Sequence, residues 1–288
     1  SNKVKMNKFK ILSVAFLAAV TVTQAQDINQ AKKEIDAEKY QNAKTTLKSI
    51  IKSDSSDGEA FFLLGNVYLY QNIADSAKIS YQNGLAAKNY SHLNNIGLGQ
   101  IDLDNGNVVA AKTKFAAAIN EKKRKDFAEY VYVARAYMNS VKTDYKAALS
   151  TLELAKEKNG QEPQVLLAFG DAYYGDKNQN AAYSAYRNAF QADNSFIRAK
   201  MQLGVLLKGA KAYTEAVAAY QAVVGTNPTY GPVYRELAET YYYWGLNVPG
   251  RQDQYFKEAL GYYEKYMSLT DYSLASRMRH ADFLILTK

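Results

Sequence analysis

The sequence contains no cysteine, which excludes disulfide bonds, thiolate catalysis and a lipid-bearing cysteine after a signal sequence. Only 4 prolines and 1 tryptophan occur in 288 residues. Few prolines, together with a hydrophobic fraction of 48%, argue against long disordered stretches. Histidine occurs twice, as His92 and His280, so a metal site or a histidine-activated nucleophile has few residues to draw on.

Motifs that carry catalytic chemistry are also missing. No Gly-x-Ser-x-Gly, phosphate-binding loop or dinucleotide fingerprint is present. The carboxylate pairs Asp102/Asp104 and Glu236/Glu239 stand without other catalytic groups, so we interpret them as solvated or groove-lining charges. Both histidines are expected to be solvated. We therefore expect a protein that is not an enzyme, with no catalytic residue, no cofactor and no metal.

The most hydrophobic stretch lies near the N-terminus, at residues 11–22. Two lysines precede it and a small-x-small pattern, TQA, follows at residues 23–25. The run is too short to span a bilayer, so a secretory signal peptide is favoured over a buried helix. Residues 1–5 precede Met6 and are interpreted as a tag remnant or a misplaced start. Residues 1–25 are thus expected to be removed, and the protein to act in the periplasm or at the cell envelope.

The charge of the processed chain is mild. Residues 1–25 hold four lysines and no acidic residue, so their removal lowers the net charge from +8 to +4. This value does not indicate a nucleic-acid partner. The basic run EKKRKD at residues 121–126 is interpreted as a solvated junction. No other segment approaches transmembrane length, so no membrane span is expected after signal removal.

A small residue recurs along the chain at steps of 34 to 36 residues. The seven positions are Ala31, Gly65, Gly99, Ala134, Gly170, Gly204 and Ala238. A large residue follows in each unit, four residues after a second small one: Leu47, Tyr81, Phe115, Leu152, Tyr186, Tyr220 and Tyr263. This period predicts repeated antiparallel helix pairs. The first helix would carry the small residue where its neighbour crosses closely, and the second an i, i+4, i+7 stripe that faces it.

These units resemble the tetratricopeptide repeat. The resemblance is carried by LGNVY (64–68), FGDAY (169–173), LAETY (237–241), AVAAY (216–220) and Pro228. It implies an all-α fold of the alpha-alpha superhelix class, a right-handed solenoid of about seven helix-turn-helix units plus a C-terminal helix. The expected units are residues 26–57, 58–91, 92–126, 127–162, 163–196, 197–230 and 231–271, with the C-terminal helix at 272–288.

Three departures from the repeat are visible in the sequence. The fourth unit carries two extra residues near positions 140–144, and the seventh carries nine extra around 245–254. Residues 272–288 read as the first helix of an eighth unit without its partner. Their FLILTK ending lacks a polar outer face, which favours a chain that continues past Lys288 over a capping helix.

The resemblance implies that the first helices line a concave groove in which a protein or peptide partner lies. The expected groove residues are Asn66, Tyr70, Gln100, Arg135, Asn139, Asp171, Tyr174, Arg198, Arg235, Glu239 and Tyr242. Tyrosine and arginine among aliphatic residues suit peptide recognition. The lysine–asparagine clamp that some members use for free carboxylates is not reproduced, because Phe62 stands where lysine is needed. The sequence therefore predicts a non-catalytic interaction scaffold.

Two other functions stay open. One is a structural spacer region of a larger envelope protein. The other is a glycan-binding envelope protein that uses the aromatic run YYYW at residues 241–244, although half-buried helix packing is the favoured interpretation of that run.

Overall fold

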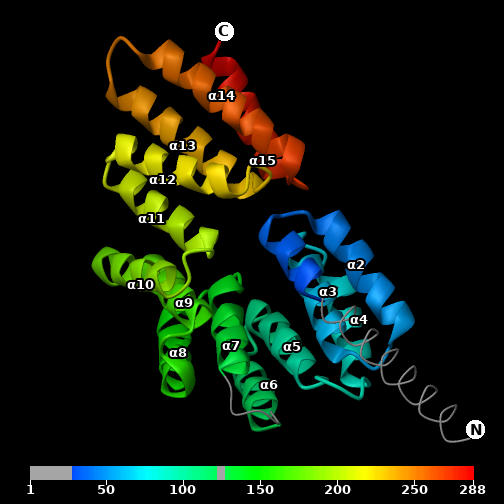
Figure 1. The fold of residues 1–288 in the computed structure, drawn as a ribbon. Helices are drawn as coiled ribbons and strands as arrows, with labels where there is room; N and C mark the ends of the chain where they lie inside the picture. The colour runs from blue at the N-terminus through cyan, green and yellow to red at the C-terminus, as the bar shows by residue number, and fades with distance from the viewer. Residues whose placement is uncertain (1–27, 122–126) are drawn as a thin grey trace, which may run out of the picture. The chain divides into compact units, whose positions relative to one another are not determined.

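The computed structural model describes residues 28–121 and 127–288, and regular secondary structure there is helical (Figure 1). Within these two ranges no β-strand forms, apart from an isolated bridge between Asp57 and Asn89. The all-α prediction is confirmed. The predicted signal peptide and most of the basic run at 121–126 lie outside the described residues. None of the described helices is both long and apolar enough to cross a membrane.

The chain divides into two compact units, residues 1–91 and residues 92–288, at the border between the second and third repeats. In unit 1, residues 28–36 are helical, and the helices that follow are α2 (Tyr40–Ser53), α3 (Gly58–Tyr70) and α4 (Ala74–Leu85). Unit 2 contains α5 (Leu93–Asp104), α6 (Val108–Asn120), α7 (Ala128–Asn139), α8 (Tyr145–Asn159), α9 (Pro163–Gly175), α10 (Gln179–Ala192), α11 (Ile197–Gly209), α12 (Tyr213–Thr226), α13 (Gly231–Asn247), α14 (Gln252–Leu269) and α15 (Leu274–Leu286).

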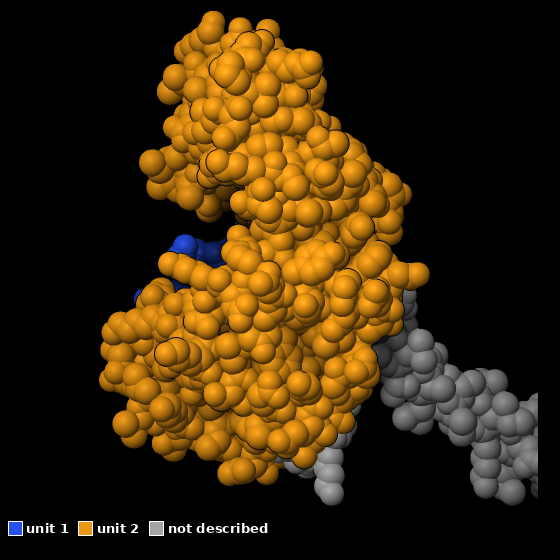
Figure 2. Space-filling model, turned by 90° about the vertical axis from the view of Figure 1, so that its left-hand side faces the viewer, with its two compact units in different colours: residues 1–91 blue, residues 92–288 orange. Residues whose placement is uncertain are grey.

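Consecutive helices pack as hairpins, each made of a first helix and a second helix. The hairpins are α3/α4 in unit 1 and α5/α6, α7/α8, α9/α10, α11/α12 and α13/α14 in unit 2. Within unit 2 the first helix α7 packs against both α5 and α9, and α15 packs against α14. Figure 2 shows unit 2 in orange, with a hollow in one edge of its outline.

At the repeated glycine, an aromatic ring of the second helix packs directly against the backbone of the first helix. A Cβ added at Gly65 would lie 2.2 Å from the ring of Tyr81, and one at Gly170 would lie 2.3 Å from the ring of Tyr186. Gly99 has the same relationship to Phe115, at 2.5 Å. Because these distances are far below van der Waals contact, no side chain fits at these glycines. The predicted close crossing is confirmed.

In the first and fourth units alanine stands at the small position, and the second helix carries leucine instead of a ring. Ala31 and Ala134 stand at the small position of their units, with Leu47 and Leu152 at the large position, and all four are fully buried. A branched aliphatic side chain leaves room for one methyl group where a ring lying on the backbone does not. The identity of the small residue therefore follows the identity of its partner in these units.

The turn between the two helices of a hairpin also repeats, in every unit except the fourth and the seventh. A residue with positive φ ends the first helix at Glu38, Asn72, Gly106, Lys177 and Lys211. The backbone amide of Asn72 donates a hydrogen bond to the carbonyl of Leu69. The next amide, that of Ile73, donates one to the carbonyl of Tyr68. This pair of hydrogen bonds is the Schellman motif, which gives the last carbonyl groups of the helix hydrogen-bond donors. It recurs at the four other positions.

The fourth and seventh units, which carry extra residues, differ from the other units in their turn and in the length of their helices. In the fourth unit the connection from Ser140 to Asp144 contains no residue with positive φ, and Asp144 caps α8 by accepting from the amide of Ala147. In the seventh unit the extra residues lengthen the helices, so that α13 spans 17 residues and α14 spans 18.

Candidate functional site

The first helices of unit 2 are joined by a cluster of side chains centred on Asp171 of α9. Arg135 of α7 forms a salt bridge with this carboxylate, and Arg198 of α11 approaches it to 3.6 Å. The hydroxyl of Tyr186 and the amide of Gln202 donate hydrogen bonds to its Oδ1 at 2.8 and 3.3 Å. Three predicted groove residues thus lie together and tie α7, α9 and α11 to one another.

The electrostatics of the cluster favour an ionised Asp171. Burial alone would raise the pKa of its carboxyl, but Arg135 and Arg198 outweigh that effect and hold the pKa below its ordinary value. Burial and the neighbouring carboxylate raise the pKa of the Tyr186 hydroxyl, which stays neutral and donates. Two guanidinium groups therefore surround this one carboxylate.

Exposed side chains stand beside this cluster. Tyr174 lies three residues after Asp171 on α9 and is 40% exposed. Asn139 lies four residues after Arg135 at the end of α7 and is exposed. Residues three or four apart occupy the same helix face, so each follows its charged neighbour along one surface. We name the surface formed by Arg135, Asn139, Asp171, Tyr174 and Arg198 the groove strip.

Charged pairs continue along the later first helices. Lys208 of α11 lies 2.6 Å from Glu236 of α13. Glu239 of α13 accepts two hydrogen bonds from Arg279 of α15, at 2.8 and 2.7 Å. The same guanidinium lies 4.2 Å from the ring centroid of Tyr242. The predicted residues Glu239 and Tyr242 are therefore both engaged by α15.

The other predicted residues of unit 2 are placed separately. Arg235 lies over the ring of Tyr266, 5.2 Å from its centroid, and donates to its hydroxyl at 3.3 Å. Gln100 is half-buried on α5, directly after Gly99. The structure does not bring either of them into the Asp171 cluster.

In unit 1 the predicted residues take part in ring contacts with neighbouring helices. Asn66 accepts a hydrogen bond of 2.7 Å from the hydroxyl of Tyr81. Tyr70 is 43% exposed and stacks on Tyr40 of α2, with ring centroids 6.0 Å apart. Asn66 in unit 1 and Asp171 in unit 2 therefore have the same role. Each accepts a hydrogen bond from the hydroxyl of the tyrosine whose ring lies on the preceding glycine.

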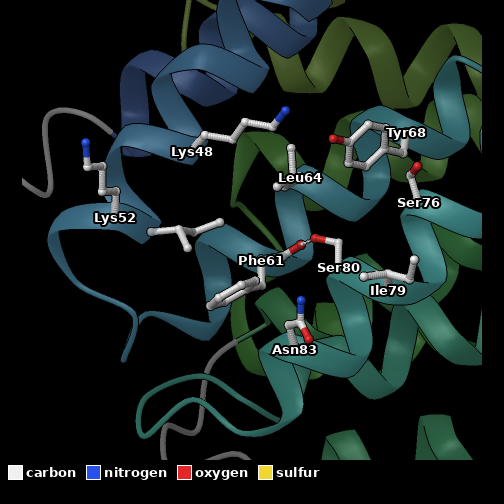
Figure 3. Close-up of a pocket in the computed structure, with 10 residues that line it drawn as sticks. Lys48, Lys52, Phe61, Leu64, Tyr68, Ser76, Ile79, Ser80 and Asn83 are labelled. Carbon is white, nitrogen blue, oxygen red and sulfur yellow. Dashed lines mark hydrogen bonds between the residues drawn. The ribbon is translucent and has the colours of Figure 1, made fainter.

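Unit 1 also contains a surface pocket that the sequence did not indicate (Figure 3). Its volume is about 320 Å³, and it lies between α2, α3 and α4. Its floor includes a hydrogen bond of 2.9 Å from the hydroxyl of Ser80 to the carbonyl of Phe61. The lining residues are Lys48, Ile51, Lys52, Phe61, Leu64, Tyr68, Ser76, Ile79, Ser80 and Asn83. The pocket combines an apolar lining with two cations.

The prediction of a solvated histidine is wrong for His92. Its side chain is only 11% exposed, and its Nε2 lies 3.0 Å from Glu129 of α7, because the N-terminal ends of α5 and α7 are adjacent. His280 is 26% exposed and lies 3.1 Å from Glu264. In the described ranges no group of three histidine or acidic side chains is arranged to hold a metal ion.

The two carboxylate pairs are structural rather than solvated. Asp102 forms a salt bridge with Lys114 of its own hairpin. Asp104 accepts from the hydroxyl of Ser140 at 2.7 Å, which fixes the start of the longer fourth turn. Glu236 forms a salt bridge with Lys208 of α11, and Glu239 forms one with Arg279 of α15, so both connect α13 to a neighbouring first helix.

The aromatic run at 241–244 packs against its neighbours. Trp244 stacks on Tyr255 of α14 with ring centroids 4.7 Å apart, and Tyr241 stacks on Tyr262 at 5.6 Å. Tyr213 of α12 covers Trp244 at 5.9 Å. The favoured interpretation of this run as helix packing is confirmed.

Two residues that donate hydrogen bonds to these carboxylates, Gln202 and Arg279, were not predicted from the sequence. Both stand two positions before the small residue of their unit, whereas Asp171 and Glu239 stand one position after it in the preceding unit. A polar residue one position after the small residue of one unit, together with a polar residue two positions before the small residue of the next, is therefore the sequence signal for these contacts.

No protein-family model and no curated protein matches the sequence. Solved structures do match the fold. A tetratricopeptide repeat protein from Parabacteroides merdae superimposes with a TM-score of 0.55 at 14% identity, over 92% of this chain and 98% of its own. A thermophilic tetratricopeptide-repeat protein from Thermus thermophilus gives 0.52 at 20% identity, over 67% and 99%.

A third similar structure is the human IFIT1 dimer with PPP-AAAA. It superimposes with a TM-score of 0.60 at 15% identity, over 91% of this chain and 62% of its own. At these identities the similarity concerns the fold, which the glycine-and-ring hairpins had already indicated. The chain has the tetratricopeptide-repeat fold.

Proposed function

We propose that the chain is a non-catalytic scaffold that binds a peptide or protein segment along the groove strip of α7, α9 and α11. The observation that carries this proposal is the arrangement of Arg135, Asp171 and Arg198, which hold one another in place beside the exposed Tyr174. A surface organised in this way loses little side-chain entropy when a partner binds.

The chemistry of the strip favours a segment that combines an acidic side chain with an apolar one. The guanidinium of Arg198, whose side chain retains 36% exposure, would pair with the acidic group. The exposed ring of Tyr174, one helical turn away, would receive the apolar group. The net charge without residues 1–25 is only +4, so we expect no nucleic-acid partner.

The pattern of residues 6–25 supports a further part of the proposal, that the protein acts after export, in the periplasm or at the cell envelope. A spacer role is the second candidate. It is favoured by the salt bridges between successive first helices, which would resist their separation under load.

The experiment selects peptides from a displayed random library on the immobilised chain, and measures their dissociation constants for three proteins: the unmodified chain and two variants. Tyr174→Ala should weaken binding by about tenfold or more, which is typical of an aromatic anchor. Tyr183→Ala is the matched control, because Tyr183 is 45% exposed but lies on the second helix α10. Equal loss in both variants, or none in Tyr174→Ala, would remove the strip from the proposal and leave the spacer role.

A further inference from the structure

The pocket of unit 1 has a filled counterpart in the last hairpin of unit 2. The repeat defines which residues correspond, because each one can be counted from the small or the large residue of its helix. Ser80 directly precedes the large residue Tyr81, and Tyr262 directly precedes the large residue Tyr263. A serine that lines the pocket thus stands where the last hairpin carries a ring.

In the last hairpin this ring contacts two others and a polar side chain. Tyr262 stacks on Tyr241 with ring centroids 5.6 Å apart, and on Tyr234 at 6.4 Å. These two tyrosines stand four residues before and three residues after Ala238, the small residue of α13. The hydroxyl of Tyr262 accepts a hydrogen bond of 3.1 Å from the amide of Gln221 of α12.

The pocket has similar aromatic surroundings without the ring. Phe61 and Tyr68 line it, and they stand four residues before and three residues after the small residue of α3. Figure 3 shows them on either side of Leu64. The short side chain of Ser80 donates its hydrogen bond to the carbonyl of Phe61, which leaves a volume of about 320 Å³.

The pocket differs from its counterpart in charge. Lys48 directly follows the large residue of α2, which is the position that Gln221 has in α12. Lys52 lies one helical turn further along α2, and both lysines line the pocket. Within the described ranges, the residues that line it include no acidic side chain. Cations therefore stand where a neutral donor meets the polar end of the ring in the last hairpin.

No other unit carries cations at both of these positions. The residues there are Gln82 and Ala86, Ala116 and Asn120, Glu153 and Glu157, Arg187 and Gln191, Gln221 and Gly225, and Glu264 and Ser268. The pair of lysines is thus particular to the helices that form the pocket and is not a feature of the repeat.

We propose that the pocket is a binding site for a free, small aromatic carboxylate. The ring of the ligand would lie against Phe61 and Tyr68, and its carboxylate would accept charge-assisted hydrogen bonds from Lys48. A volume of about 320 Å³ is at the lower end for small-molecule sites, so the ligand has a single ring. The site uses α2, α3 and α4, none of which carries the groove strip, and it does not depend on the proposed function.

The probe is para-methylbenzoate, which is the side chain of tyrosine with a carboxylate in place of the hydroxyl. A titration followed by the NMR signals of the ligand should show saturable binding to the whole chain, with a dissociation constant of about 1 mM or below. The amide, para-methylbenzamide, has the same shape without the charge. The cyclohexane analogue has the charge without the aromatic ring. Each should bind about three- to tenfold more weakly.

The chain variants locate the site. Ser80→Tyr should abolish binding, because the new ring fills the pocket as Tyr262 fills its counterpart. Ser49→Tyr, at an exposed residue of α2 outside the lining, is the matched control and should bind normally. Circular dichroism would verify that each variant remains folded.

A second pair of variants tests the charge. Lys48→Gln copies the residue of the counterpart, and it should weaken binding of para-methylbenzoate about five- to tenfold and leave binding of the amide unchanged. Lys78→Gln removes the same charge from an exposed residue of α4 outside the lining, and its effect should be less than about twofold.

Three results would overturn the inference. The first is no saturable binding of para-methylbenzoate, and the second is unchanged binding by a folded Ser80→Tyr chain. The third is equal weakening in Lys48→Gln and Lys78→Gln, which would mean that the general charge of the surface, rather than this pocket, attracts the anion.

Discussion

The ring of Tyr220 occupies the space that a side chain of residue 204 would need. A Cβ added at Gly204 would lie 2.5 Å from the nearest ring carbon, and the ring itself is fully buried. Glycine at this position lets α11 and α12 approach until the ring rests on the backbone. The same relationship between a first helix and its second helix explains why the residues recur at a fixed distance along the chain.

Replacing Gly204 by leucine should therefore damage a single hairpin. We expect the free energy of unfolding to fall by about 1–3 kcal/mol, the usual cost of overpacking. Because repeats contact only their neighbours, amide hydrogen exchange should speed up in α11 and α12 and stay unchanged in α5 and α6. Gly261→Ala is the matched control. Space around Gly261 is open, so this change should raise the free energy of unfolding by about 0.5–1 kcal/mol.

The repeated turn predicts a stabilising substitution. Lys211 ends α11 with a φ of 62°, a conformation that costs a residue with a side chain about 1 kcal/mol or more. Lys211→Gly should therefore raise the midpoint of chemical denaturation. Ala210→Gly, at the adjacent residue with a φ of −80°, gains no such relief and should lower the midpoint. A rise in both variants would mean that flexibility of the turn, rather than its φ value, decides the effect.

The hairpins could be predicted from the sequence because their cause is local and repeated. A glycine and a ring at constant separation indicate a close helix crossing wherever they occur, and Gly65 with Tyr81 and Gly204 with Tyr220 satisfy this description. The turns at positions 71–73, 105–107, 176–178 and 209–211 each contain an asparagine or a glycine, residues that are typical of turns. Each was found as a helix end with one positive φ value.

The candidate site was less predictable, because it depends on which residues of different repeats meet. The sequence placed Arg135, Asp171 and Arg198 on one surface, but their mutual pairing depends on the distance between three helices. His92 shows the same limit. Its position at the start of a helix suggested that its side chain is exposed to solvent. Instead, Glu129 of the neighbouring first helix lies against it. The division of the chain after Ser91 falls on a predicted repeat border, but nothing in the repeat pattern distinguishes that border from the others.

The Asp171 cluster predicts a pH-dependent contribution to stability. Because the pKa of Asp171 is lowered in the folded chain, its stabilising effect is present above the ordinary value of 3.8 and is lost as the pH falls through the lower, folded value. Asp171→Asn should reduce the free energy of unfolding by about 2–3 kcal/mol at pH 7, since it removes a partly buried, charge-assisted set of bonds. Below pH 3 the difference between the two proteins should shrink.

The control for this measurement is Asp176→Asn, at an exposed residue five positions further along the chain. It should change the free energy of unfolding by less than about 0.5 kcal/mol across the pH range. Urea denaturation at several pH values would give both comparisons. A constant difference between wild type and Asp171→Asn down to pH 2 would contradict the assigned ionisation.

Arg279 should decide how firmly α15 is attached to the array. Its guanidinium forms two hydrogen bonds with Glu239 and lies against the rings of Tyr242 and Phe283, at 4.2 and 4.6 Å from their centroids. Lysine keeps the charge but has neither the planar fork nor the stacking surface, so Arg279→Lys should cost about 1–2 kcal/mol. The loss should appear as faster hydrogen exchange in α15.

The matched control is Arg277→Lys, two residues earlier on the same helix. The Arg277 side chain lies over the exposed ring of Tyr272, 5.5 Å from its centroid. An exposed stacking pair contributes little, about 0.5–1 kcal/mol, so exchange in α15 should change less than in Arg279→Lys. If the two variants opened α15 equally, packing of Phe283 beneath the helix, and not the salt bridge to Glu239, would be what holds it.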